Sequence, residues 1–320
     1  MAGRHAEGCG IGSRHRSTRI WGGQQSDMGI QPRKTYHLRL KDSILALGER
    51  TLLMGVINVT PDSFSDGGRF FEQDAALRQA QELIDAEVDL LDIGGESTRP
   101  FAEPVPVDSE LRRVLPIIEG IRKISDIPIS IDTVKAEVAR QALAAGANII
   151  NDVTSLRADA EMVKLAAATG VPLILMHMQG SPQTMQVSPY YNALFSEIIA
   201  FLENRIQFAT ENGVEREQIV VDPGIGFGKT IAHNLMLVRE LERFQALNRP
   251  ILLGASRKRF IGAILNRPVE DREVGTAVIH SFAIAGGVHL LRVHDVALHR
   301  QVALMGDALR NGHGHESECA

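Results

Sequence analysis

Eight short apolar runs, each closing on a polar residue, form the dominant pattern of this chain. They alternate with helix-like stretches, as buried parallel strands joined by crossover helices do. Eight such units predict an α/β fold, a TIM (β/α)8 barrel. The residues closing the runs are Asn58, Asp92, Asp132, Asn151, His177, Asp222, Ser256 and His294. Because barrel enzymes gather their chemistry at the carboxyl ends of the strands, we expect these side chains to converge on one mouth.

The length predicts one domain. The chain has 320 residues, 44% of them hydrophobic, and a barrel of about 250 residues is ordinarily a single domain. We therefore expect a barrel over residues 36–310, with flexible tails at 1–35 and 311–320. The first of these contains several arginines and glycines but few acids. That composition suits a disordered extension, with an organelle-targeting segment as the alternative.

Composition also restricts the partners. The net charge is −5, and lysine and arginine are spread along the chain without a basic stripe, so nucleic acid is not an expected partner. No apolar stretch approaches the roughly 20 residues that cross a bilayer, so no membrane is expected. Cys9 and Cys319 lie in the tails, which disfavours a disulfide framework or a thiolate metal site. A cytoplasmic protein fits these observations.

Periodicity indicates which faces are buried. Apolar residues recur at helical spacing in one stretch, and that face should pack on the barrel. They are Leu111, Val114, Leu115, Ile118 and Ile121. Along the last apolar run, the two-residue period of a strand places Arg292 and His294 on one side, where both cations would point into the mouth.

Two polar, glycine-containing segments, 60–68 and 94–100, follow the first two runs. Their composition suits mobile loops over the mouth, the alternative being ordinary surface loops. A third segment, 222–230, reads DPGIGFGKT and resembles a nucleotide phosphate loop. Its spacing excludes that reading, because Gly224 is followed by three residues rather than four before the Gly-Lys pair. These glycines are expected to form a tight turn instead.

The mouth should bind a flat, anionic ligand. Aspartate and asparagine at several strand ends form a donor and acceptor array for a heterocycle. Ser256-Arg257-Lys258 follows the seventh run and Arg292 lies in the eighth, where barrels often bind phosphate. The alternative is that Arg292 pairs structurally with Asp295 or Asp92. Zinc is not expected, because Met176 and Met178 flank His177 and no His-x-His pair closes the first run.

These residues together resemble the dihydropteroate synthases of the pterin-binding barrel family. The resemblance extends from about Thr51 to Val296, in an order of motifs that is highly specific. The matching segments are 54–68, 94–100, 131–133, 151–153, 176–180, 222–229, 256–258 and 292–295.

The resemblance implies condensation of 6-hydroxymethyl-7,8-dihydropterin pyrophosphate with p-aminobenzoate, giving 7,8-dihydropteroate and pyrophosphate. It implies Mg²⁺ as cofactor, with Asn58 as its ligand, and a homodimer whose interface involves helices near residues 270–310. The implied catalytic residues are Asp132, Asp222 and Lys258, with Asp222 and Lys258 acting as a pair. The implied pterin ligands are Asp132, Asn151, Asp222 and Lys258. Pyrophosphate is implied to bind Asn58, Arg292 and His294. The implied ligands of p-aminobenzoate are Thr98, Arg99, Pro100, Phe227 and Ser256.

The chain departs from the family pattern at Phe101, and two other functions are alternatives. Phe101 replaces a common small residue, and we expect it to crowd the p-aminobenzoate site and alter acceptance of sulfonamide analogues. A methyltetrahydrofolate-binding barrel of the corrinoid methyltransferases needs no pyrophosphate site, so Arg292 and His294 argue against it. A pterin-binding barrel without turnover is the remaining alternative, against which the complete anion site argues.

Overall fold

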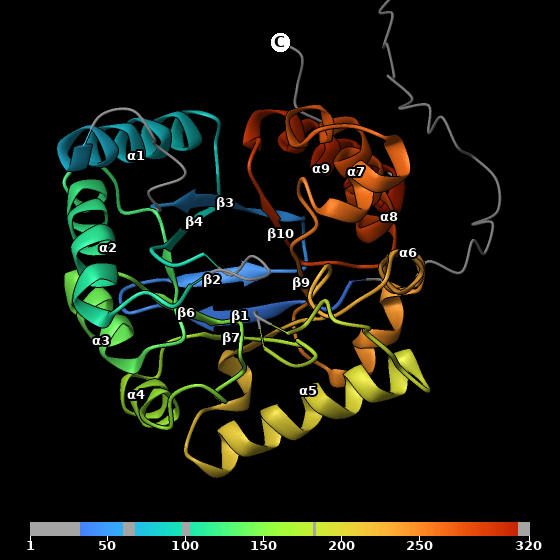
Figure 1. The fold of residues 1–320 in the computed structure, drawn as a ribbon, viewed down its shortest axis with the longest axis horizontal. Coiled ribbons are helices and arrows are strands. Elements are labelled where there is room, and N and C mark those ends of the chain that lie inside the picture. The colour runs from blue at the N-terminus through green and yellow to red at the C-terminus, as the bar shows by residue number, and fades with distance from the viewer. Residues whose placement is uncertain (1–32, 60–67, 98–102, 182–183, 313–320) are drawn as a thin grey trace, which may run out of the picture. The chain divides into compact units, whose positions relative to one another are not determined.

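The computed structural model describes residues 33–59, 68–97, 103–181 and 184–312. The side chains of 68–72 are not described. Eight parallel strands form one sheet in the order β8-β7-β6-β5-β4-β3-β10-β9. A parallel bridge between Val221 and Ile251 brings the two ends of this order together. The predicted TIM barrel is confirmed, with its helices around the outside of the strands (Figure 1).

Each barrel strand is short and nearly all buried, as expected for a parallel sheet covered by helices. The strands are β3 (Leu52–Asn58), β4 (Leu90–Gly94), β5 (Ile129–Asp132), β6 (Ile149–Asp152), β7 (Leu173–Met176), β8 (Ile219–Asp222), β9 (Leu252–Leu253) and β10 (Leu290–Val293). Most predicted run ends lie at or next to a strand end. The exceptions are Asp92, which lies inside β4, and Ser256, which follows β9 in a turn.

The described helices are α1 (Gly68–Asp85), α2 (Val107–Arg122), α3 (Ala136–Ala145), α4 (Glu161–Thr169), α5 (Leu194–Glu211), α6 (Ile231–Arg239), α7 (Arg259–Leu265), α8 (Glu273–Ala285) and α9 (Val296–Asn311). Short 3-10 turns lie at Arg216–Gln218, Leu241–Leu247 and Val269–Asp271. The amphipathic face predicted for α2 is confirmed, because Leu111, Val114, Ile118 and Ile121 are buried and Leu115 packs partly buried against the same core. Among the described residues, no helix has the length and apolar character to cross a membrane.

An antiparallel hairpin that the sequence analysis did not anticipate precedes the barrel. Its strands are β1 (Tyr36–Arg39) and β2 (Ile44–Leu47). Leu38 and Leu47 pack with the first inward-facing residues of the barrel strands, such as Leu52 and Leu290. The hairpin therefore covers the amino end of the barrel, and the carboxyl end is left for the site.

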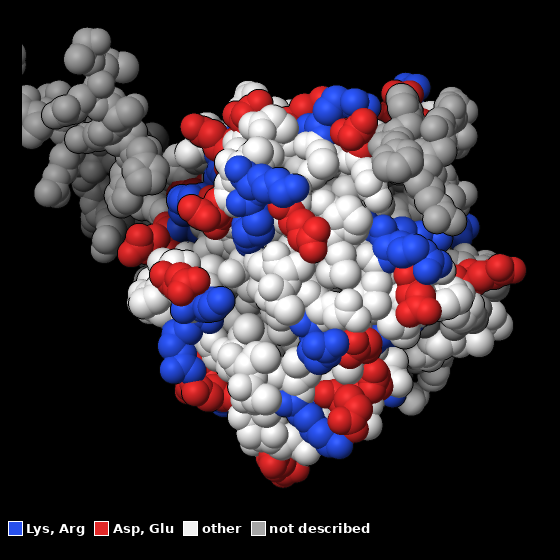
Figure 2. Space-filling view, turned by 90° about the vertical axis from the view of Figure 1, so that its left-hand side faces the viewer, with Lys and Arg blue, Asp and Glu red and all other residues white. Residues whose placement is uncertain are grey.

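A buried ion pair also ties the chain together at the amino end. Asp307 of α9 accepts hydrogen bonds from Arg33 at 2.8 Å and from the backbone N–H of Thr51, just before β3, at 2.6 Å. On the face shown in Figure 2, acidic and basic side chains are interspersed. That face carries no large patch of one charge.

Candidate active site

The strand register points a set of polar side chains to the inside of the barrel. Inward positions alternate along each strand, so Met54 and Asn58 share a face on β3, and Leu290 and Arg292 share one on β10. Met54 and Leu290 belong to the inner core. On five strands, the inward-facing residue nearer the carboxyl end is polar. These residues are Asp92, Asp132, Asn151, Asp222 and Arg292.

Arg292 of β10 reaches across β3 to side chains of β4 and β5. Its Nε donates to Oδ2 of Asp92 at 2.6 Å, and its Nη2 donates to Oδ2 of Asp132 at 3.0 Å. Asn151 donates from Nδ2 to the same Asp92 oxygen at 3.2 Å. The pairing of Arg292 with Asp92, considered above as an alternative to ligand binding, is therefore present. Asp92 is a site residue to which the sequence analysis assigned no role in binding.

The carboxylates of the site differ in their protonation. Burial raises the pKa of Asp132 to about 7, with a further rise from the negative charge of Asp92, while Arg292 opposes the shift. Burial raises the pKa of Asp222 to about 6, opposed by the Gly224 N–H and by nearby cations. Oδ1 of Asp132 is buried and has no hydrogen-bond partner among the described residues. It is a polar atom placed for a ligand.

The segment after β8 is a glycine turn, as predicted. Gly224, Gly226 and Gly228 all have positive φ. A Cβ on Gly224 would lie 1.9 Å from the carbonyl oxygen of His177, so only glycine fits there. The Gly224 N–H donates to Oδ1 of Asp222 at 2.7 Å. The turn thus holds the carboxylate in place.

Lys229, which the sequence analysis treated only as part of a motif, is buried beneath this turn. Its Nζ donates to the Phe227 carbonyl at 2.9 Å and lies 3.0 Å from Nδ1 of His177. Burial lowers the pKa of Lys229 to about 7, against the opposing effect of Asp222. The signal that could have identified it was a lysine at the end of a glycine turn that follows a site aspartate.

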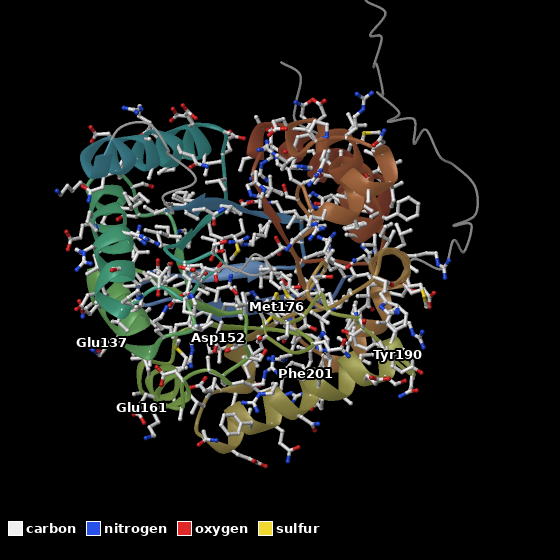
Figure 3. All side chains as sticks on the ribbon, viewed as in Figure 1. Glu137, Asp152, Glu161, Met176, Tyr190 and Phe201 are labelled. Carbon is white, nitrogen blue, oxygen red and sulfur yellow. The ribbon has the colours of Figure 1, made fainter. Side chains whose placement is uncertain are left out.

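His177 does not join the mouth, and that expectation was wrong. Its ring packs edge-on against that of Phe201, with 4.9 Å between ring centroids. Phe201 lies on α5, where Figure 3 labels it. His177 follows Met176 by one residue, and Met176 packs instead with Val153 and Phe227. Because successive side chains of an extended segment point to opposite sides, Met176 takes the inward position.

Lys258 and Phe227, assigned to different substrates above, lie next to each other. Nζ of Lys258 lies 4.0 Å from the centroid of the Phe227 ring, a cation–π contact. Burial and the charge of Arg292 lower the pKa of Lys258 to about 8, opposed by Asp222 and Asp132. No direct ion pair joins Asp222 and Lys258 in the described part of the chain, so the expected pair interacts through space.

Ser256 and His294 contact each other. Ser256 Oγ lies 2.9 Å from Nδ1 of His294 and accepts the His294 backbone N–H at 3.3 Å. Burial lowers the pKa of His294 to about 3, and Arg292 adds to the shift. The expectation of two cations is therefore corrected. At neutral pH, Arg292 is the cation and His294 is a neutral hydrogen-bonding group, because a buried imidazole beside a guanidinium releases its proton.

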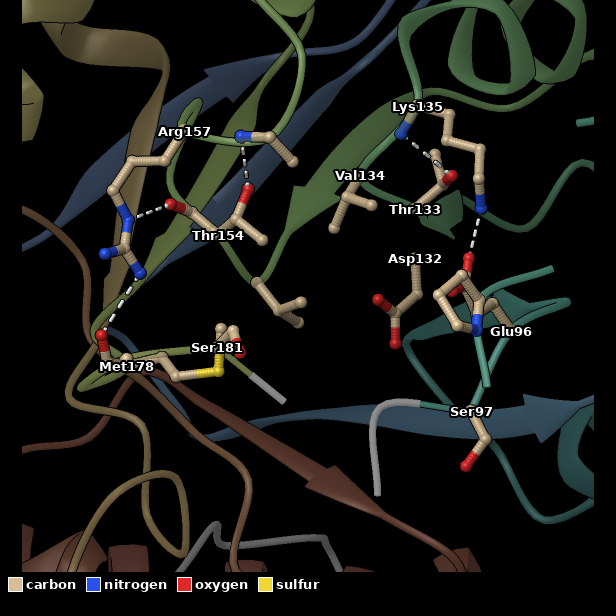
Figure 4. Close-up of a pocket in the computed structure, with 14 residues that line it drawn as sticks. Glu96, Ser97, Asp132, Thr133, Val134, Lys135, Thr154, Arg157, Met178 and Ser181 are labelled. Carbon is tan, nitrogen blue, oxygen red and sulfur yellow. Dashed lines mark hydrogen bonds and ion pairs between the residues drawn. The ribbon is translucent and has the colours of Figure 1, made fainter. Parts of the chain in front are cut away.

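A cavity of about 400 Å³ borders the site on the side of β5 and β6 (Figure 4). Asp132 forms part of its wall, with Thr154 and Arg157 opposite and Lys135 beside Glu96. Asn58 ends β3 half-buried, next to Gly94 of β4 in the sheet. The expected ligands Thr98, Arg99 and Pro100, the residue Phe101 and nearly all of segment 60–68 lie outside the described residues.

Comparison with known proteins agrees with this geometry. Residues 54–294 match the pterin binding enzyme family. The chain is 47% identical over 263 residues to the dihydropteroate synthase of Synechocystis, covering 82% of this chain and 91% of the relative. It is 45% identical over 281 residues to that of Bacillus subtilis, covering 88% and 96%.

Solved structures agree as well. Xanthomonas albilineans dihydropteroate synthase with 4-aminobenzoic acid superposes with a TM-score of 0.81 at 42% identity, covering 87% of this chain and 99% of that one. The same enzyme in complex with 7,8-dihydropteroate gives a TM-score of 0.77 at 40% identity, covering 86% and 98%. The chain belongs to the pterin-binding enzyme family, among its dihydropteroate synthases.

Proposed function

We propose that this protein joins 6-hydroxymethyl-7,8-dihydropterin pyrophosphate to p-aminobenzoate, forming 7,8-dihydropteroate and releasing pyrophosphate in folate biosynthesis. The observation that carries the proposal is the polar cluster at the carboxyl end of the barrel. There Asp132, Asn151 and Asp222 are buried at strand ends, and the cationic Arg292 donates to Asp132. The Xanthomonas albilineans relative, solved with 4-aminobenzoic acid and with 7,8-dihydropteroate, supports it.

The pterin ring is assigned to Asp132, Asn151, Asp222 and Lys258. Acceptor and donor atoms on several strand ends suit the edge of a flat heterocycle. Asp222, with a pKa of about 6, is mostly ionised at pH 7 and is suited to stabilise positive charge developing on the ring and its methylene. Asp132, with a pKa of about 7, is divided between two forms and can also donate a hydrogen bond.

The pyrophosphate is assigned to Arg292, His294 and Asn58. Arg292 is positively charged, and its guanidinium can hold phosphate oxygens as the C–O bond breaks. His294 is neutral at pH 7, and its ring is oriented by contact with Ser256. It contributes a hydrogen bond rather than a charge. Of these three residues, Arg292 is the one that supplies positive charge to the leaving group.

Mg²⁺ is proposed as the cofactor. The ion prefers oxygen ligands and commonly takes one or two from the protein and others from substrate phosphates. Asn58 offers an amide oxygen at the carboxyl end of β3. The described residues contain no cluster of three or more His, Cys, Asp or Glu that could hold a metal. This donor set fits an ion shared with pyrophosphate. When bound, the ion neutralises charge on the leaving group.

The p-aminobenzoate is assigned to Phe227 and Ser256, together with Thr98, Arg99 and Pro100. Phe227 provides an aromatic surface beside Lys258, and Ser256 provides a hydroxyl. An aniline nitrogen is already nucleophilic, so positioning it against the methylene supplies much of the rate acceleration. The substituted sulfonamides, which resemble p-aminobenzoate, are expected to compete for this position.

The test of function measures pyrophosphate release and dihydropteroate formation from the pterin pyrophosphate and Mg²⁺, with and without p-aminobenzoate. Both products should appear only when p-aminobenzoate is present. Pterin binding without either product would favour a barrel that has lost turnover, and absence of pterin binding would refute the assignment of the site. Removal of Mg²⁺ by a chelator should abolish turnover, and added Mg²⁺ should restore it.

A homodimer through α8 and α9 is also proposed. The two helices pack together and carry apolar side chains that are at least half exposed in the single chain. These are Val274, Val278, Phe282, Leu304, Met305 and Leu309. Size-exclusion chromatography with light scattering should give twice the mass of the chain, and Phe282→Glu should give a monomer. The cytoplasmic location stays a prediction.

A further inference from the structure

The turn between β9 and α7 contains an unusual backbone. Arg257 has a φ of 56°, in the left-handed region that a non-glycine residue adopts at a cost. Ser256 and Lys258, two residues of the proposed substrate site, flank it. A residue held in this conformation sets the directions of both neighbours. The contacts that hold Arg257 therefore affect the site.

Among the described residues, three at the start of α8 or just before it make these contacts. The N–H of Arg257 donates to Oγ1 of Thr276 at 3.2 Å, and its carbonyl accepts from Nη1 of Arg272 at 3.0 Å. Its guanidinium forms an ion pair with Glu273. The Thr276 hydroxyl is itself oriented, because it donates to the carbonyl of Arg272 at 2.9 Å. One helical turn thus holds the backbone and side chain of a single residue.

Glu273 is oriented in turn by two buried histidines. Nε2 of His299, on α9, lies 3.2 Å from Oε2 of Glu273, and Nδ1 of His299 lies 3.1 Å from Nδ1 of His280, on α8. If Nε2 of His299 donates to the carboxylate, its Nδ1 must accept, so His280 carries its proton on Nδ1. Nε2 of His280 then carries no proton and is a buried acceptor without a partner among the described residues.

We propose that Glu273 is a positioning residue for the reaction. By holding Arg257 in its left-handed conformation, it keeps Ser256 against His294 and Lys258 over Phe227. The inference rests on the proposed function, since Ser256 and Lys258 are its assigned substrate ligands. The competing explanation is an ion pair that contributes only to stability.

Glycine at position 257 separates the two explanations. Glycine adopts a φ of about 60° without a steric penalty, so the turn should no longer depend on an anchoring side chain. Glu273→Gln in the native chain should lower kcat/KM about 10- to 100-fold, the size of effect expected from a displacement of about 1 Å, with a raised KM for p-aminobenzoate. In the Arg257→Gly background, the same substitution should change kcat/KM less than about twofold relative to that background.

Asp307→Asn is the matched control for stability. It breaks a buried ion pair on α9 at the amino end of the barrel, far from the substrate residues. It should lower the melting temperature and leave both KM values unchanged. If Glu273→Gln leaves kcat/KM unchanged, or acts equally in the native and Arg257→Gly backgrounds, the proposal is refuted.

Hydrogen exchange makes the test independent of turnover. Exchange of amides 255–260 in the ligand-free protein should be faster in Glu273→Gln than in the native chain, and should not change in Asp307→Asn. Unchanged exchange would contradict the coupling even if the native protein turned out to catalyse another reaction. Should Glu273→Gln fail to fold, Glu273→Asp carries the same comparison, since its shorter side chain withdraws the carboxylate from the Arg257 guanidinium.

Discussion

Arg292 and Asp92 form a buried ion pair across the mouth of the barrel, with 2.6 Å between Nε and Oδ2. The side chain of Asp92 is fully buried, and that of Arg292 is 22% exposed. Arg292 donates to Asp132 as well. Asp92 thus orients the cation proposed to hold pyrophosphate and also influences the protonation of Asp132.

Asp92→Asn should destabilise the protein and lower the pKa of Asp132. Removing one partner of a buried ion pair costs about 3 to 5 kcal/mol. Because the charge of Asp92 raises the pKa of Asp132, its loss should move that pKa below about 7. Chemical denaturation measures the first effect and carboxyl NMR titration the second. Glu137→Gln, in an exposed ion pair with Arg140, should leave both unchanged; an unaltered Asp132 titration in Asp92→Asn would contradict the prediction.

Asp132 should make the ligand-free protein less stable as the pH rises. Its pKa is raised from 3.8 in the unfolded chain to about 7 in the folded one, so its contribution is fully present below pH 3.8 and is lost as the pH rises through about 7. Asp132→Asn removes this dependence. The stability of the variant relative to the native chain should therefore increase between pH 4 and pH 7, by a few kcal/mol at most. Urea titrations at several pH values measure the difference, and a constant difference would refute the pKa shift.

Lys229→Met should shift the acid limb of the activity profile to higher pH. Lys229 lowers the pKa of Asp222, so an uncharged side chain raises it. The ionised fraction of Asp222 at pH 6 to 7 then falls, and kcat/KM should fall with it. Lys229→Arg, which retains the charge, should keep the limb near its native position. Identical profiles for Lys229→Met and the native protein would show that the amine does not act on Asp222.

Lys229 should also affect stability at alkaline pH. Its pKa is lowered from 10.5 to about 7, so its contribution to stability is present above pH 10.5 and is lost as the pH falls through about 7. Relative to the native protein, Lys229→Met should therefore become more stable as the pH falls from 10 to 7. Thermal unfolding across this range measures the trend. A relative stability that does not change with pH would indicate that the amine keeps an ordinary pKa.

Gly224→Ala should destabilise the turn after β8 far more than Gly170→Ala destabilises the end of α4. Both glycines have positive φ, which costs an L-residue about 1 to 2 kcal/mol. A Cβ at Gly224 also collides with the His177 carbonyl at 1.9 Å, whereas one at Gly170 meets nothing within 4 Å. Denaturation compares the two variants. Equal losses of stability would mean that the turn rearranges without cost.

The sequence alone identified the barrel and the order of its site motifs. Eight apolar runs with polar ends can be recognised as strands in the sequence, because the strands are short and buried and because side chains alternate along them. Asp132, Asn151, Asp222 and Arg292 were found by this pattern, and the structure brings all four to the carboxyl end of the barrel. The hairpin at the amino end was missed, because its strands form no run long enough to stand out from the tail.

The tertiary structure decided the connections between these residues. Arg292 contacts Asp92, His177 points away from the mouth, and Lys229 is buried beside His177. These arrangements depend on distances between strands that are remote in sequence. The charges of the site depend on the same packing. A histidine in sequence is a candidate cation, but burial beside Arg292 leaves His294 neutral, because desolvation and a neighbouring positive charge both disfavour its protonated form.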